Sequence, residues 1–129
     1  MVTEDYCSFE IAKLLKEKGF DTQVYHGYYN DIGYYVDRPN LLISCEYYKI
    51  VTLQTTMKWL REIHKIHINL DIHWLHFANQ NGWMYVIERI LDNGVDYVDS
   101  KGDSSDLTFF STYEEACERA IEYVLKNLI

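Results

Sequence analysis

The chain has 129 residues, of which 48% are hydrophobic and 25% are charged, and this composition suits one globular domain over residues 1–129. Its formal net charge of -8 argues against a protein that follows nucleic-acid phosphates or binds an anionic membrane surface. The N-terminus is acidic where a secretory signal is basic, and no apolar run approaches the ~20 residues of a membrane span. We therefore expect a cytoplasmic protein.

The first predicted element is a capped helix over residues 9–18, within the segment SFEIAKLLKEKGF. Ser8 can accept a hydrogen bond from an early helical amide, and Gly19 suits the left-handed position just past the last turn. Phe20 then falls where it can contact Leu15 and close that turn.

Two aromatic, β-prone runs follow in residues 23–36, QVYHGYYNDIGYYV, and they flank a turn sequence that ends at Gly33. This pattern predicts a β-hairpin. Pro39 interrupts regular pairing, and we expect a short strand and then irregular chain over residues 41–51. Tyr28 and Tyr29 are candidates for a partner-binding surface, because a twofold homodimer is a common way to cover an aromatic edge.

A second helix is predicted after Thr52, which is a good N-cap residue. Apolar residues recur on one side of it at helical spacing, from Leu53 through Met57 and Leu60 to Ile63.

The next segment, HKIHINLDIHWLHF at residues 64–77, contains four of the five histidines. Its period is two, so His67, Asp71 and His73 share one face of a strand, opposite an apolar row. His67 and His73 are roughly 20 Å apart by strand rise, which is too far for one metal ion. We predict a polar strand face with no metal or other cofactor, and we take these three residues as a candidate partner-binding surface.

The C-terminal half predicts two more turns and a third helix. Asn81-Gly82 is typical of a type I′ turn before a return strand, and residues 92–94 precede a third short strand. A polar loop, SKGDSSD, precedes a capping box formed by Thr112 and Glu115. The order α-β-β-α-β-β-β-α predicts an α+β two-layer sandwich, with three helices and one antiparallel sheet of about four to five strands.

No catalytic motif occurs, so we predict no catalytic residues and disfavour an enzyme. The three cysteines are widely spaced and are expected to be small buried side chains. One alternative remains open, a metal-assisted hydrolase in which folding brings His26 together with His67 or His73.

Several segments together form a pattern that covers most of the chain, namely residues 8–20 (SFEIAKLLKEKGF), 52–62 (TLQTTMKWLRE), 66–68 (IHI), Trp83 with Tyr85, and 113–120 (YEEACERA). This pattern resembles a family of small uncharacterised proteins found in gut anaerobic bacteria and their temperate phages or mobile elements. The chain departs from the family pattern at Val51, where the family has a proline. The resemblance implies a small cytoplasmic accessory protein, with no known activity or cofactor.

The leading hypothesis is therefore a non-enzymatic interaction protein with a protein partner, or one that forms a homodimer. An acidic chain can also bind a basic protein in place of DNA, and the final helix and residues 92–106 carry carboxylates that suit this role.

Overall fold

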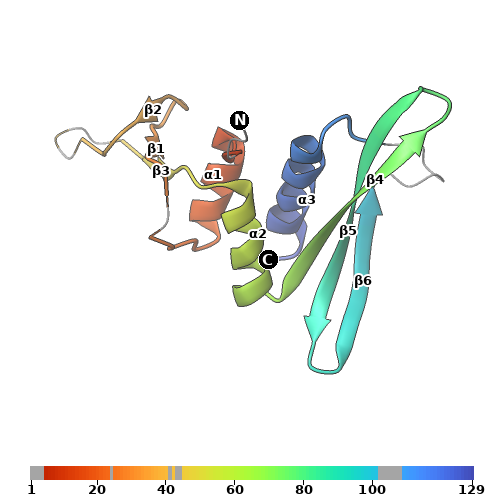
Figure 1. The fold of residues 1–129 in the computed structure, drawn as a ribbon. Helices are drawn as coiled ribbons and strands as arrows, with labels where there is room; N and C mark the ends of the chain where they lie inside the picture. The colour runs from red at the N-terminus through yellow and green to blue at the C-terminus, as the bar shows by residue number, and fades with distance from the viewer. Residues whose placement is uncertain (1–4, 24, 41, 43–44, 102–108) are drawn as a thin grey trace.

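The computed structural model describes residues 5–23, 25–40, 42, 45–101 and 109–129 (Figure 1). Its elements in chain order are α1 (Phe9–Glu17), β1 (Tyr28–Tyr29), β2 (Tyr35–Val36), β3 (Tyr48–Lys49), α2 (Leu53–Ile63), β4 (Ile66–Leu75), β5 (Gln80–Leu91), β6 (Gly94–Lys101) and α3 (Tyr113–Asn127). Every strand pair among these elements is antiparallel, so the predicted α+β class with three helices is confirmed. The predicted polar loop lies mostly outside the described residues.

The strands form two three-stranded sheets, β2-β1-β3 and β4-β5-β6, where we expected one sheet. β1 pairs with β2 on one edge and with β3 on the other, so it has no edge left to extend into the larger sheet. The helices lie between the two sheets, with α1 against β3 and with α2 and α3 against β4 (Figure 1).

The predicted cap residues lie at the helix ends, and the Glu115 carboxylate accepts a hydrogen bond from the Ser111 hydroxyl. The Ser8 hydroxyl accepts a hydrogen bond from the amide of Ile11 at 3.3 Å, and Thr52 and Thr112 cap the other two helices in the same way. Gly19 adopts a φ of 86°, and the Phe20 amide donates to the Leu15 carbonyl at 2.9 Å. This last pair is the 6→1 hydrogen bond of a Schellman motif, which is why the helix stops there.

The hydrophobic core is centred on α3. Its apolar side is completely buried, and the residues concerned are Ala116, Cys117, Ala120, Ile121, Val124 and Leu125. This side contacts α1, α2, β4 and β5. Ile66 and Ile68 of β4 meet it from the larger sheet, as the predicted alternation requires, whereas Ile63 at the end of α2 is exposed.

The turn between β4 and β5 differs from the prediction. Asn81 and Gly82 lie inside β5, opposite Trp74 and His73, and residues 76–79 make the turn instead. Asn79 takes the left-handed conformation there, with φ at 52°. A four-residue loop of this kind fits an asparagine as well as a type I′ turn fits Asn-Gly, so the dipeptide alone was a misleading signal.

Gly82 is instead a point of close approach. A Cβ atom at this position would lie 2.6 Å from Leu75 Cδ1 and 2.9 Å from Phe109 Cβ. The leucine tip can rotate away, but the Cβ of Phe109 is fixed to the backbone. The glycine therefore lets residue 109 pack directly on the sheet.

We predict that Gly82→Ala lowers the free energy of unfolding by about 1–3 kcal/mol, because the added methyl group overpacks this contact. Chemical denaturation measures the change. Asn81→Ala, at the exposed neighbouring position of the same strand, is the matched control and should change the stability little. Equal stability of the Gly82→Ala variant and the wild type would contradict the close packing.

Candidate functional site

The polar face of β4 lies opposite the row that Ile66 and Ile68 bury against the helices. Asp71 and His73 are exposed on it, and His67 is half-buried. Across the sheet these residues face Met84, Gly82 and Glu88 respectively. The predicted face is thus formed, and its two histidines stay six residues apart along one strand.

Tyr28 and Tyr29 lie in β1, on the other side of the helices, so the structure does not bring them together with His67, Asp71 and His73 (Figure 1). The Tyr29 hydroxyl donates to the Cys7 carbonyl at 2.7 Å, and burial raises its pKa. Tyr29 is therefore an anchor that ties the small sheet to the start of α1. The pKa of Tyr28 is raised chiefly by a hydrogen bond with Tyr25.

His26 precedes β1, and its ring stacks on Tyr6 with the centroids 4.5 Å apart. Its backbone amide donates to the Ile50 carbonyl at 2.7 Å, which fixes it beside the small sheet. It does not meet His67 or His73, because the helices stand between the sheets (Figure 1). Within the described part of the chain, no group of three or more His, Cys, Asp or Glu residues could hold a metal ion.

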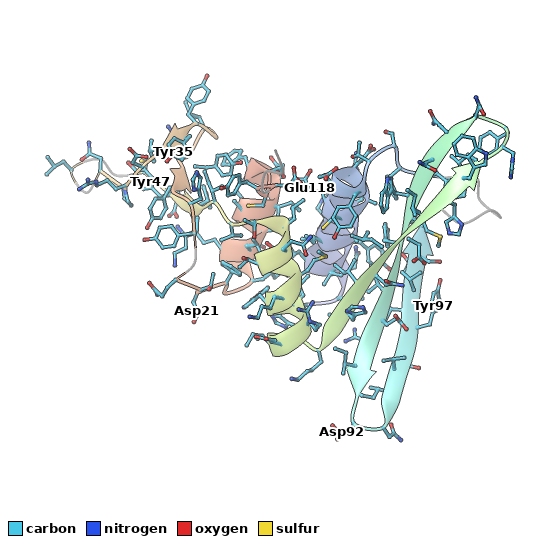
Figure 2. All side chains as sticks on the ribbon, in the orientation of Figure 1. Asp21, Tyr35, Tyr47, Asp92, Tyr97 and Glu118 are labelled. Atoms are coloured by element: carbon cyan, nitrogen blue, oxygen red, sulfur yellow. The ribbon has the colours of Figure 1, made fainter. Side chains whose placement is uncertain are left out.

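A pocket of about 390 Å³ lies between α1 and the small sheet. Figure 2 shows Tyr47, one of its wall residues, far across the helices from Tyr97 of β6. The lining residues come from four separate segments and are Ala12, Leu15, Lys16, Phe20, Tyr28, Pro39, Cys45, Glu46, Tyr47 and Lys49. Sequence reasoning missed this pocket because no local motif links these segments.

The charged side chains of the pocket have different partners. Lys16 Nζ donates to the Glu46 carboxylate and, at 3.1 Å, to the Tyr47 carbonyl. Lys49 Nζ donates to the Thr22 carbonyl at 2.9 Å and lies 5.1 Å from the centre of the Tyr25 ring. Both contacts of Lys49 are to neutral groups, so its charge is not balanced by them.

The Tyr47 hydroxyl is held at the pocket by two contacts. A hydrogen bond with the Cys45 thiol raises its pKa, while the Asn40 amide donates to the hydroxyl at 3.1 Å and acts in the opposite direction. The phenol therefore remains protonated and neutral at physiological pH, and it can donate or accept a hydrogen bond.

A second, acidic groove lies between α1 and α3. Glu118 Oε1 accepts a hydrogen bond from the Ser8 amide at 3.1 Å, and Figure 2 shows this residue where the two helices meet. Glu10 joins the carboxylates of α3 along the groove, with Arg119 among them. Of the acidic residues proposed in the segment 92–106, Asp103 and Asp106 lie outside the described residues.

Two of the cysteines are buried, as expected. Burial raises the pKa of Cys7 to about 11 and that of Cys117 to about 12. Cys45 is half-buried at the pocket.

Neither a protein-family model, nor a curated protein, nor a solved structure matches this chain. The resemblance to small proteins of gut anaerobes and their phages therefore stays a prediction. Among the described residues, no helix is long and apolar enough to cross a membrane.

We predict that one thiol per chain reacts with a disulfide reagent at pH 8 in the folded protein. Cys7 and Cys117 are protonated at that pH because their pKa values are raised to about 11 and 12, and the thiolate is the reactive form. The absorbance of the thiolate released from 5,5′-dithiobis(2-nitrobenzoate), followed over time, counts the reactive thiols. All three thiols should react in denaturant.

The Cys45→Ser variant is the control for this assignment, and it should abolish the fast phase. Fast reaction of two or three thiols in the folded wild-type protein would contradict the burial of Cys7 and Cys117.

Proposed function

We propose that this chain is a cytoplasmic interaction protein, and that it associates with a second copy of itself through the free edge of β4. The observation that carries the proposal is the sheet order β4-β5-β6, in which the ten-residue β4 has β5 as its one neighbour among the described strands. A free strand edge presents unpaired backbone donors and acceptors, which a second strand can satisfy.

The far end of β4 extends beyond the helices that cover the sheet. β5 has 12 residues and a length of about 40 Å, whereas the 15 residues of α3 span about 22 Å. The β4–β5 turn consequently projects past the helices (Figure 1). Ile72 and Trp74 belong to the apolar row of β4, yet both are 50% exposed.

The backbone of β4 shows which groups face the free edge. The Ile90 amide donates to the Lys65 carbonyl at 2.8 Å, and Ile66 is the register partner of Arg89. Ile66 is therefore a non-hydrogen-bonded position with respect to β5, and the alternation of antiparallel pairing repeats every second residue. The amides and carbonyls of Leu70, Ile72 and Trp74 thus point away from β5.

Two copies of β4 can pair antiparallel about a twofold axis at Ile72. In this register Leu70 lies beside Trp74 of the second copy, so the exposed apolar rows of the two copies contact each other across the strands. On the other face, Asp71 is opposite His73 of the second copy. Moving the twofold axis by one residue, to Asp71 or to His73, places Asp71 opposite Asp71 or His73 opposite His73, and neither pair brings opposite charges together. The sequence of the edge therefore favours the register centred on Ile72.

This register uses Asp71 and His73, two of the residues that the sequence indicated as a partner-binding surface, whereas Tyr28 and Tyr29 are not needed. Such a symmetric interface is the commonest in soluble oligomers. The free thiols of Cys7, Cys45 and Cys117 support the proposed cytoplasmic location, because reduced cysteines are typical of that compartment.

We expect the wild-type chain to sediment at twice the monomer mass at micromolar concentration. Ile72→Lys should weaken association by about tenfold or more, because it places two lysines opposite each other at the twofold axis and removes their apolar contact. Ile63→Lys is the matched control, since Ile63 is also an exposed isoleucine but lies on α2. A monomeric wild type, or equal dissociation of both variants, would overturn the proposal.

A charge exchange tests the register itself. His73→Glu places a carboxylate opposite Asp71 and should weaken association by about three- to tenfold, because two such pairs form per dimer. Adding Asp71→Arg restores an opposite-charge pair and should recover most of the loss in sedimentation equilibrium. A double variant no tighter than His73→Glu alone would exclude this register.

A further inference from the structure

The pocket between α1 and the small sheet has the construction of a small-molecule site. Its volume of about 390 Å³ falls within the roughly 300–1,000 Å³ that is usual for ligand pockets. Its floor lies on the helix side, on α1, whose buried face also packs against α3. The floor of the pocket is therefore supported by the protein core.

The floor of the pocket is apolar. Ala12 and Leu15 of α1 and Phe20 after the helix are all buried, yet they line this cavity. Phe20 is held from behind by Trp59, with the ring centroids 5.2 Å apart at 71°. The floor therefore offers a fixed apolar surface to the body of a ligand.

Two aromatic side chains stand at the wall. The rings of Tyr28 and Tyr47 have centroids 6.4 Å apart and an interplanar angle of 82°, an edge-to-face arrangement. Two phenol rings beside an apolar floor favour a flat aromatic ligand. Stacked and edge-to-face aromatic pairs contribute interaction energy beyond that of the apolar area they bury.

The pocket also carries a net positive charge within an acidic chain. Lys16 and Lys49 line it together with one carboxylate, that of Glu46. Lys16 is the lysine that pairs with Glu46. Among the ion pairs of the described residues, none involves Lys49, whose contacts are the Thr22 carbonyl and the Tyr25 ring. An anionic group on the ligand would satisfy this charge.

We propose that this pocket binds a small planar aromatic molecule that carries a carboxylate, with the ring on the floor of Leu15 and Phe20 and the carboxylate at Lys49. This site lies on the opposite side of the helices from β4, so it is independent of the proposed dimer.

The probe for the test is 2-naphthoate, and its neutral counterpart is 2-naphthamide. Isothermal titration calorimetry measures both affinities in the whole 129-residue chain. We expect the wild type to bind the acid more tightly than the amide. Lys49→Met keeps an unbranched side chain of similar length. It should weaken binding of the acid by about tenfold and leave binding of the amide unchanged, because one charge-assisted hydrogen bond to the acid is lost.

Lys58→Met is the matched control, because Lys58 is an exposed lysine of α2 that does not line this pocket. It removes the same charge from the chain and should leave both affinities unchanged. Circular dichroism checks that each variant is folded. The proposal is overturned if the wild type does not bind the acid at millimolar concentration. It is also overturned if Lys49→Met lowers the affinities for acid and amide equally, or if Lys58→Met lowers the affinity for the acid as much as Lys49→Met does.

Discussion

The arrangement of the whole molecule depends on the burial of α3. Six apolar side chains of this helix are completely removed from solvent, and four different elements are needed to cover them. α1 and α2 cover two sides, and the strands β4 and β5 cover a third. The last helix of the chain is thus the partner that the earlier elements share, and Glu118, which accepts the Ser8 amide, also joins it to the start of α1. Without α3, α1 would still contact β3 and β4 would still contact α2, but both would lose the helix that they share.

A helix of this length cannot cover the sheet that it supports. Ile66 and Ile68 meet the helices and are buried, whereas Ile72 and Trp74 continue the same row and stay half exposed. Apolar residues alternate along the whole of β4, but the helices cover only part of this row. The surplus apolar length is costly to leave in water, at about 25 cal/mol for each Å². This cost is the physical reason for expecting a second strand at that edge.

Local chemistry made much of the fold predictable. Ser8, Gly19 and Thr52 determine helix ends through bonds within a few residues, and those ends were predicted within one residue or so. Asn81 and Gly82 led to the wrong turn prediction. Gly82 is needed instead for its close contact with Phe109, which is distant in sequence. The number of sheets could not be predicted from local sequence patterns either, because it depends on which strands β1 pairs with. The face of β4 was predictable from its period, but the pocket was not, because its wall residues come from segments that only tertiary packing brings together.

The proposed ligand pocket and the proposed β4 interface lie on opposite sides of the helices, and strand length distinguishes the two sides. On the small sheet, strands of two residues cannot form a wide face, and tyrosines and lysines from α1, from the short strands and from the chain beside them enclose a pocket instead. On the larger sheet, strands of eight to twelve residues form a wide face and a long edge. Short strands therefore favour enclosure of a small ligand, and long strands favour association with another chain. The histidines of β4 belong to the second case: their spacing prevents shared metal coordination, while the same spacing lets Asp71 and His73 alternate with the apolar row along an edge that can pair with itself.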